Sequence, residues 1–573
     1  MDETELAGLV DRATHWRDAD PDPRTRREVD RLIELVTSGD STVSGEAVDD
    51  LVQRFSGSLQ FGTAGLRGAL GAGPNRMNRA VVIRAAAGIA GHLHQALATV
   101  GADGEQPRVV VGYDARHDSD VFARDTCAVL TAAGCVAQLL PGPLPTPVLA
   151  FALRHLHADA GIMVTASHNP PQDNGYKVYL GGRADSSPGS GAQIVPPMDD
   201  LIAHQIAAAP PAIDVPMATD GWEPIGPSIV DEYLASVGAV LTPGSAREIS
   251  IVLTPLHGVG GDTAVRAFAA AGFPAPYVVE QQAQPDPDFP TVSFPNPEEP
   301  GALDLALAAA RERGADLVIA NDPDADRCAV AVPVPEGDWR MLRGDEVGAL
   351  LGDYLLVRGV RGVVASSIVS SQLLSRVAAA HGVPHTETLT GFKWLARVPE
   401  LSYAYEEALG YCVSPGAVRD KDGISAALLI AEYAAQLRAQ GRTLLDALND
   451  LATRHGLHAT DQFSVRVDDL AQISSMLDRI TQRPPANLGG SPVKSAEDLS
   501  EGVDGLPGTP GLRYRTTNGD RVIVRPSGTE PKLKCYLEVV IPVENGSVDR
   551  AREAAADRLA RITADVSHAL GIS

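Results

Sequence analysis

Short apolar runs alternate along most of the chain with longer stretches rich in alanine and leucine. Five of these runs predict buried strands, at residues 109–111, 161–164, 249–253, 317–320 and 363–365. Strands that alternate with helices predict βαβ units and a largely parallel sheet. Because such sheets bind ligands outside the carboxyl ends of their strands, the polar loops that follow these runs become candidate sites.

The two ends of the chain depart from this pattern. Residues 1–53 predict a charged amphipathic helical extension with a break at the Pro-Asp-Pro sequence of 21–23. Residues 521–540 predict a strand, a loop and a strand, and residues 548–570 predict an amphipathic helix. At 573 residues the chain is too long for one hydrophobic core. We expect the extension (1–53), three α/β domains (54–212, 213–337 and 338–458) and a smaller α+β domain (459–573).

Composition narrows the classes of partner. The chain has 48 basic and 73 acidic residues, a formal net charge of −25, which argues against nucleic acid or an anionic membrane as partner. Its five cysteines are scattered without a CxxC pair, so no zinc site is predicted and a reducing compartment fits. The sequence contains neither a run of about 18 apolar residues nor a basic, apolar leader, so we expect a cytoplasmic protein that does not span a membrane.

The first candidate site is GIMVTASHNP at 161–170, where a predicted strand ends in a loop. The loop presents Ser167 beside His168, and Lys177 follows ten residues after the serine. Such a hydroxyl can be a nucleophile when a base activates it or when it already carries the transferred group, and Lys177 could supply or receive the proton. The loop could instead make only turn hydrogen bonds. The hydrolase elbow G-x-S-x-G is absent, which disfavours an esterase.

The second candidate site is DLVIANDPDADR at 316–327, with Asp322, Asp324 and Asp326 directly after a predicted strand. In an extended loop this spacing points three carboxylates the same way, and a cation relieves their repulsion. All-oxygen ligands favour magnesium or calcium over zinc. An EF-hand is excluded, because Arg327 and Pro333 stand where its glycine and glutamate belong. Two alternatives stay open: a solvated acidic turn, and an aspartyl phosphatase with Asp322 as nucleophile. Arg327 would suit a phosphate held against the metal.

The third candidate site is RVIVRPSGTEPKLK at 521–534, a strand followed by a basic, glycine-containing loop. A guanidinium group, hydroxyls and backbone N–H groups can form a phosphate cradle, although a plain basic turn has the same composition. The residues concerned are Arg525, Ser527, Gly528, Thr529, Lys532 and Lys534.

Three weaker loops complete the set. Carboxylates can bind sugar hydroxyls and cations can bind phosphates, but both residue types are also common on protein surfaces. The loops are LTGFKW with Thr390, Gly391 and Lys393; YEEALGY with Glu406 and Glu407, followed by Lys421; and FGTAGLRG with Arg67.

Taken together and in this order, six motifs resemble those of the α-D-phosphohexomutase family. They are GTAGLRG, TASHNP, DPDADR, TGFKW, EEALGY and RPSGTEPK, and they extend from about residue 55 to 540. DNGYKVY at 173–179 and GFKW resemble the phosphoglucomutase and phosphopentomutase branch in particular. The resemblance implies an α/β fold, with three related mixed-sheet domains and a smaller C-terminal α+β domain around a central cleft.

The resemblance also implies roles for the candidate residues. Ser167 would be the phosphoserine, and it would bind Mg²⁺ together with Asp322, Asp324 and Asp326. Three catalytic residues, Arg67, His168 and Lys177, would surround the transferring group. The substrate-binding residues would be Arg327, Thr390, Gly391, Lys393, Glu406, Glu407, Lys421, Arg525, Ser527, Gly528, Thr529 and Lys534.

The implied activity is a magnesium-dependent interconversion of glucose 1-phosphate and glucose 6-phosphate, with a sugar 1,6-bisphosphate as intermediate and activator. Many hexomutases have a serine two residues after the sugar-binding glutamate; aligned on Gly410, that glutamate is Glu407 and the serine position is Leu409. The lost hydroxyl keeps mannose and pentose phosphates open as substrates. A phosphatase and a catalytically inactive sugar-phosphate sensor are rivals from other classes. The expected partner is a small phosphosugar, and the expected state is a monomer or homodimer.

Overall fold

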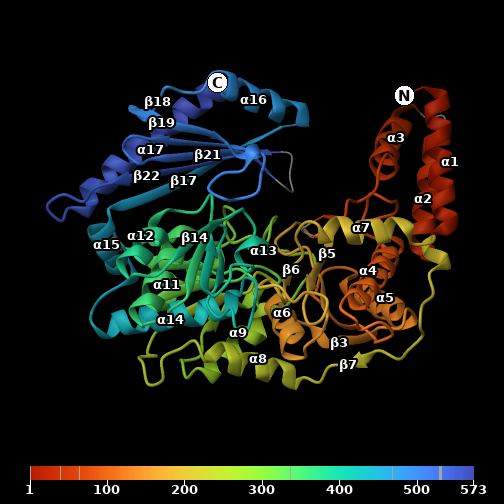
Figure 1. Cartoon of the computed structure of the whole chain (residues 1–573), viewed down its shortest axis with the longest axis horizontal. Coiled ribbons are helices and arrows are strands. Elements are labelled where there is room, and N and C mark those ends of the chain that lie inside the picture. The colour runs from red at the N-terminus through yellow and green to blue at the C-terminus, as the bar shows by residue number, and fades with distance from the viewer. Residues whose placement is uncertain are drawn as a thin grey trace. The chain divides into compact units, whose positions relative to one another are not determined.

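The structure of the protein, a computed structural model, describes residues 2–38, 41–62, 65–335, 337–467, 469–527 and 532–572. The chain forms two compact units. Figure 1 labels many of the helices and strands that make them up. The first unit comprises residues 1–341 with 410–435, and the second comprises residues 342–409 with 436–573.

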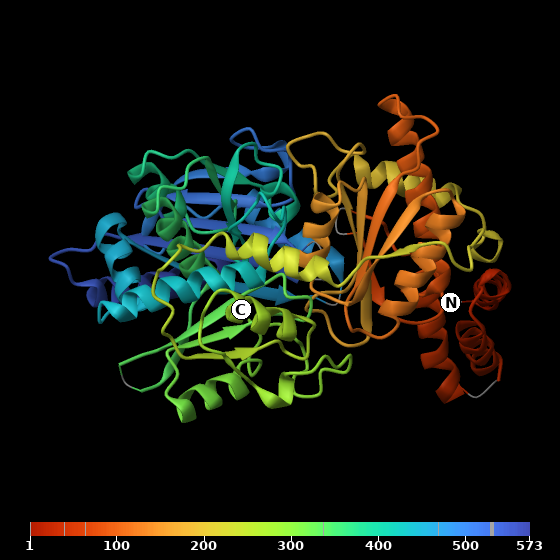
Figure 2. The ribbon, with the colours of Figure 1, turned by 90° about the horizontal axis from the view of Figure 1, so that it is seen from below.

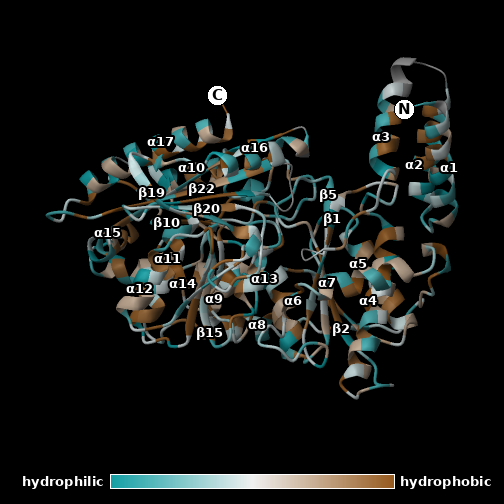
Figure 3. Cartoon of the chain, turned by 45° about the horizontal axis from the view of Figure 1, so that its top comes forward, coloured by the Kyte–Doolittle hydropathy of each residue, from teal (hydrophilic) through white to brown (hydrophobic). Residues whose placement is uncertain are grey.

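The first unit begins with three helices, α1 (Glu3–Ala19), α2 (Pro23–Thr37) and α3 (Ser41–Phe55). The predicted break at 21–23 is confirmed: Asp22 caps α2 and accepts a hydrogen bond from Arg24 N at 2.8 Å. Pro23 opens α2, because a missing N–H costs nothing at a first helical position. The buried residues of α2 follow helical spacing, and Figure 3 shows hydrophobic and hydrophilic residues on all three helices.

The first sheet has the order β1-β5-β4-β2-β3-β7, with β6 beside β5. Most of its strands are orange in Figure 2. Its central strands are parallel, whereas β5 runs antiparallel to both β4 and β1. The core includes Val109, Val111, Ile162 and Val164 from the predicted strands. The strands are β1 (Leu66–Ala69), β2 (Arg108–Tyr113), β3 (Val136–Pro143), β4 (Ala160–Val164), β5 (Asp173–Leu180), β6 (Ala192–Gln193) and β7 (Glu223–Pro224); the helices are α4 (Arg79–Thr99), α5 (Ser119–Ala132), α6 (Thr146–His155) and α7 (Met198–Ala208).

The second sheet, also in the first unit, has the order β12-β11-β10-β8-β9. Strands β8 and β10 pair in parallel, and β11 continues the sheet antiparallel to β10. The strands are β8 (Ile251–Thr254), β9 (Tyr277–Val278), β10 (Leu317–Ala320), β11 (Ala329–Pro333) and β12 (Trp339–Met341); the helices are α8 (Ser228–Gly238), α9 (Gly260–Ala270) and α10 (Asp304–Arg313).

The second unit contains a parallel set of strands in which β13 lies between β14 and β15. Its elements are β13 (Val363–Ser367), β14 (His385–Thr388), β15 (Leu401–Glu406), α11 (Gly344–Val357), α12 (Leu373–Ala380), α13 (Phe392–Leu395) and α15 (Leu444–His455). Strand β16 (Gly410–Cys412) and helix α14 (Gly423–Ala439) follow β15 in the chain.

The C-terminal part of the second unit is an antiparallel sheet of order β17-β22-β21-β20-β19-β18. The predicted strand, loop and strand correspond to β21 and β22, and the predicted helix is confirmed as α17. The elements are β17 (Leu457–Arg466), β18 (Asn487–Leu488), β19 (Ser491–Asp498), β20 (Leu512–Thr516), β21 (Arg521–Pro526), β22 (Lys532–Ile541), α16 (Leu470–Gln482) and α17 (Val548–Leu570).

Each of the five predicted buried strands overlaps a strand of the structure, β2, β4, β8, β10 or β13. The predicted fold class, α/β domains with a smaller C-terminal α+β domain, is therefore confirmed. The four domain boundaries remain a proposal. No helix in the described part of the chain has the length and apolar character that crossing a bilayer requires.

Candidate active site

Ser167 lies in the loop at the carboxyl end of β4. Its side chain is buried, and its backbone N–H donates to Thr165 Oγ1 at 2.8 Å. Its φ of 53° is uncommon for a residue other than glycine. Such conformations cost free energy and cluster at functional sites, where the surrounding structure enforces them.

Arg116, which was not identified from the sequence, helps to hold the Ser167 loop in this conformation. Its buried guanidinium donates to the backbone carbonyls of Ser167 at 2.6 Å, Pro170 at 2.8 Å and Asp173 at 3.1 Å. One side chain therefore fixes the curve of the Ser167 loop. The available signal was a charged residue just after a buried strand, at the end of the sequence Tyr-Asp-Ala-Arg of 113–116.

The three aspartates follow β10 and lie against Ser167. They are fully buried, and one oxygen from each lies within 4.8 Å of the others. Ser167 Oγ donates to Asp322 Oδ2 at 2.8 Å. Burial, together with the charges of Asp324 and Asp326, raises the pKa of Asp322 well above its ordinary value. The loops of two different sheets thus form one buried acidic site next to a hydroxyl.

Two buried lysines pair with this acidic site. Nζ of Lys177, on β5, lies 2.7 Å from Asp324 Oδ2 and 3.0 Å from Asp326 Oδ2. Nζ of Lys421 lies 2.7 Å from Asp326 Oδ2. Burial opposes the charged form of Lys177, but Asp324 and Asp326 outweigh it and raise its pKa. In this arrangement Lys177 can donate a proton or neutralise charge. In the sequence Lys421 follows the loop predicted to bind the sugar, whereas in the structure it lies against the aspartates.

The remaining predicted residues of the first unit surround Ser167 and Asp322. His168 Nδ1 lies 3.2 Å from Ser167 Oγ, and burial, with the charges of Arg327 and Arg67, lowers the pKa of His168 well below its usual value. Arg327 donates its backbone N–H to Asp322 Oδ1 at 3.0 Å, and its Nε lies 3.9 Å from Asp322 Oδ2. Arg67, on β1, is half-buried. Burial lowers the pKa of its guanidinium.

The aspartate site has the donor set for a hard divalent cation. Asp324 Oδ1 and Asp326 Oδ1 are buried and accept no hydrogen bond from the described residues. Unpaired buried oxygens of this kind are costly, and a bound cation would satisfy them. The donors are carboxylate and hydroxyl oxygens, so the residues present fit Mg²⁺ better than Zn²⁺.

Two further residues support the loop that carries the three aspartates, and they were not identified from the sequence. Thr146, the first residue of α6, donates Oγ1 to Asp324 Oδ2 at 2.7 Å and its backbone N–H to Asp324 O at 2.9 Å. Gly258 lies against Pro323, where an added Cβ would fall 2.3 Å from Pro323 Cα. Only glycine fits at position 258 without displacing the loop.

The other predicted residues lie in the second unit. Gly391, with φ 109°, precedes α13, which carries Lys393, and Thr390 lies just before them. Glu406 ends β15 and is buried, and Glu407 follows it.

The predicted phosphate cradle lies on the hairpin of β21 and β22. Arg525 on β21 stands opposite Lys534 on β22, and Ser527 follows β21. Gly528 and Thr529 lie outside the described residues. The structure therefore locates part of the predicted cradle, at the connected ends of two paired strands.

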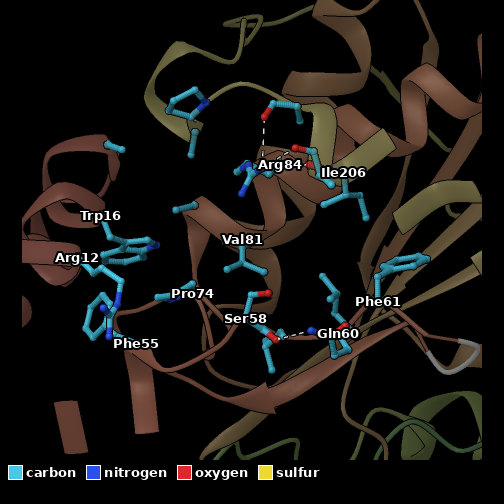
Figure 4. A pocket seen from close by; sticks show the side chains of 18 of the residues that line it. Arg12, Trp16, Phe55, Ser58, Gln60, Phe61, Pro74, Val81, Arg84 and Ile206 are labelled. Carbon is cyan, nitrogen blue, oxygen red and sulfur yellow. Dashed lines mark hydrogen bonds between the residues drawn. The ribbon is translucent and has the colours of Figure 1, made fainter. Parts of the chain in front are cut away.

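A separate cavity of about 820 Å³ lies between the N-terminal helices and the first sheet's helices (Figure 4). Trp16 of α1, Phe55 of α3, Val81 of α4 and Ile206 of α7 line it, and Arg84 donates to Ile206 O at 3.1 Å. Of the predicted site residues in the described ranges, none lines this cavity.

The sequence matches models of known protein families along most of its length. Four family models match in succession: "Phosphoglucomutase/phosphomannomutase, alpha/beta/alpha domain I" over residues 58–209, domain II over 231–335, domain III over 343–455, and the C-terminal domain over 465–556. Together they match well over half of the chain.

Individual relatives point the same way. The "Probable phosphomannomutase" of Haemophilus influenzae is 46% identical over 81% of this chain and 93% of the relative. The phosphopentomutase of Mus musculus is 33% identical over 96% of this chain and 93% of the relative. A solved structure of a phosphoglucomutase/phosphomannomutase family protein from Burkholderia thailandensis covers 89% of this chain and 97% of its own, at 20% identity and a TM-score of 0.65, and shows the shared fold.

The fold and the buried serine, aspartate and lysine site define an enzyme that transfers phosphoryl groups within its substrate, an isomerase of the mutase type. The chain belongs to the phosphoglucomutase/phosphomannomutase family.

Proposed function

We propose that the protein is a magnesium-dependent phosphosugar mutase in which Ser167 carries the transferred phosphoryl group. The observation that carries this proposal is the 2.8 Å contact between Ser167 Oγ and Asp322 inside the buried aspartate cluster. An ordinary structural serine gains nothing from a strained backbone beside three carboxylates. A phosphoserine would lie against a metal site, with Lys177 and Arg327 close by.

The chain's own residues would then manage charge and protons. Phosphoryl transfer depends mainly on positioning and on neutralising charge. The P–O bond to Ser167 breaks as a P–O bond to a substrate hydroxyl forms; that hydroxyl loses its proton and Ser167 Oγ gains one, so the proton count is unchanged. His168 Nδ1, 3.2 Å from Oγ, is placed to exchange that proton. Bound by Asp322, Asp324 and Asp326, Mg²⁺ would neutralise charge on the phosphoryl oxygens.

The second unit would recognise the rest of the substrate. We propose that Glu406, Glu407, Thr390, Gly391 and Lys393 bind the sugar. Residues on the β21–β22 hairpin, namely Arg525, Ser527 and Lys534, would bind the phosphate that does not react, together with Gly528 and Thr529. A sugar 1,6-bisphosphate is the intermediate this scheme requires, because the enzyme must give one phosphoryl group and take back the other.

We propose glucose 1-phosphate and glucose 6-phosphate as the substrate pair, in a cytoplasmic monomer or homodimer. Two alternatives have specific support. The name of the Haemophilus influenzae relative, at 46% identity, favours mannose phosphates. The name of the mouse relative favours pentose phosphates, and so does Leu409, which offers no hydroxyl where many hexomutases have a serine.

The test is kcat/KM for glucose 1-phosphate, mannose 1-phosphate and ribose 1-phosphate, with Mg²⁺ and trace sugar bisphosphate, on wild type and Ser167→Ala. We expect the variant to lose isomerisation, and the wild-type Ser167 peptide to carry an extra mass of about 80 Da from phosphate. Ser375→Ala, which removes a hydroxyl bonded to Gln372 O, is the matched control. Release of inorganic phosphate that survives Ser167→Ala would replace the mutase with an aspartyl phosphatase.

A further inference from the structure

The carboxylate of Glu407 is held by two serine hydroxyls that no sequence motif singled out. Ser367 Oγ and Ser370 Oγ both donate to Glu407 Oε2, at 3.0 and 3.1 Å. The backbone N–H of Glu407 also donates to Ser370 Oγ at 3.1 Å. Both serines are buried, whereas Glu407 is half-buried. Ser370 therefore fixes Glu407 through its side chain and its backbone at once.

This arrangement leaves the other carboxylate oxygen for a ligand. Glu407 Oε1 accepts no hydrogen bond from any residue within the described ranges. Strands β13 and β15 are parallel neighbours that end at Ser367 and Glu406, so the serines and Glu407 share the carboxyl edge where ligands bind. A carboxylate oriented through Oε2, with Oε1 not engaged by these serines, suits a sugar hydroxyl.

The loop that carries Ser370 is tied to the C-terminal sheet by a buried arginine. Arg521, on β21, donates Nη1 to Ile368 O at 3.0 Å and Nη2 to Ser370 O. Only 3% of Arg521 is exposed. A guanidinium buried against two loop carbonyls restricts where that loop can lie.

Glu538, the residue paired with Arg521 on the neighbouring strand, also binds the Ser370 loop. Glu538, on β22, is paired in register with Arg521 and accepts hydrogen bonds from Ser371 Oγ at 2.7 Å and Gln372 N at 2.8 Å. Burial opposes its charge, but Arg521 and His458 hold the pKa of Glu538 down at about 2. The Arg521–Glu538 pair is therefore ionised. Removal of either side chain would leave the other as an unpaired buried charge.

The same two strands lead to the proposed phosphate cradle. Arg525 stands four residues after Arg521 on β21, about 13 Å along a strand. Lys534 stands opposite Arg525 on β22. One hairpin thus carries cradle residues at its connected end and clamps the Ser370 loop further along.

We infer that Ser370 is a positioning residue for the sugar-binding carboxylate of Glu407, and that the Arg521–Glu538 pair holds the Ser370 loop in register with the phosphate-binding hairpin. This inference rests on the proposed function, in which Glu407 contacts the sugar. Its consequence is that Glu407 and the cradle share one rigid support within the second unit.

A double-mutant cycle tests the first link. Ser370→Ala should lower kcat/KM for the preferred sugar phosphate about 10- to 100-fold, as expected for a lost hydrogen bond to a charged group. In a Glu407→Gln background the same substitution should cost less than about twofold, because groups that act through one another are not additive. Ser402→Ala is the control, since its hydroxyl bonds Val363 O at the opposite end of β15. Ser402→Ala should leave kcat/KM within about twofold of wild type.

Arg521→Lys tests the second link. Lysine keeps the charge opposite Glu538 but cannot reproduce the paired carbonyl contacts of the guanidinium fork. We expect kcat/KM to fall about tenfold, and this loss also to vanish in the Glu407→Gln background. Thermal unfolding verifies that each variant is folded; if Arg521→Lys does not fold, the Ser370 cycle alone decides.

Three results would overturn the inference. They are an unchanged kcat/KM in Ser370→Ala, full multiplication of the Ser370→Ala and Glu407→Gln losses, and a Glu407→Gln variant with wild-type kinetics. Any of these leaves the mutase itself intact, because that function is judged separately by Ser167→Ala. Conversely, if the enzyme releases phosphate without isomerising sugars, the proposed mutase function itself is wrong, whatever the role of Ser370.

Discussion

Thr146 offers the sharpest test of the proposed metal site, because its hydroxyl orients Asp324, one of the proposed metal ligands, without being a proposed ligand itself. Its hydroxyl donates to Asp324 Oδ2 at 2.7 Å, and Lys177 shares the same oxygen at 2.7 Å. Thr146 and Asp324 are both fully buried. Thr146→Val keeps the shape of the side chain and removes only the donor.

The size of the effect follows from the contact. A hydrogen bond to a charged group contributes about 1.5–3 kcal/mol. Residues that orient a metal ligand typically change metal affinity or activity by about 10- to 100-fold when removed. We therefore expect the Mg²⁺ concentration for half-maximal activity to rise about 10- to 100-fold, because Asp324 Oδ2 loses one of the two donors that it has among the described residues.

The assay is a Mg²⁺ titration of mutase activity after chelation, paired with calorimetric titration of Mg²⁺ alone. Thr126→Val is the matched control: Thr126 is equally buried and bonds Phe122 O at 2.7 Å and Tyr176 OH at 2.8 Å. An unchanged Mg²⁺ dependence in folded Thr146→Val, or an equal change in Thr126→Val, would refute the reasoning.

Three other predictions address the loops and the second unit. Arg116→Lys cannot reproduce the planar guanidinium fork that bonds carbonyls spread along the Ser167 loop, so we expect lower kcat and a lower midpoint of thermal unfolding; a normal kcat would show that the loop holds its shape unaided. Gly258→Ala forces Pro323 and its loop to shift, which should cost about 100-fold in kcat/KM, checked by steady-state kinetics against wild type. Burial raises the pKa of Asp345 to about 7, so the stabilisation that its protonated form provides is fully present below about pH 4 and is lost as the pH rises through 7. That loss amounts to at most about 4 kcal/mol. Asp345→Asn should therefore flatten the fall of the unfolding midpoint between pH 5 and 8, and parallel curves for the two proteins would contradict this assignment.

The sequence by itself determined the elements and the kinds of chemistry. Apolar runs marked the strands that precede the Ser167 and Asp322 loops, and helical spacing marked α17, because strand and helix periods are local properties of the chain. The spacing of the aspartates likewise predicted a carboxylate cluster, since neighbouring residues in a loop stay close in any fold. Local order is enough for such features.

Only the tertiary structure decided which of these pieces meet. Ser167 and Asp322 are 155 residues apart, and their contact depends on how two sheets pack within the first unit. The contacts of Thr146 with Asp324 and of Lys421 with Asp326 also join segments that are distant in the sequence. Proximity in the sequence had placed Lys421 with the predicted sugar-binding loop instead. Arg116 and Ser370 were missed because their partners are backbone carbonyls or a distant carboxylate, and neither interaction leaves a periodic pattern. The chain's local order specifies its strands, helices and loops, whereas the burial of side chains from distant segments against one another assembles the site.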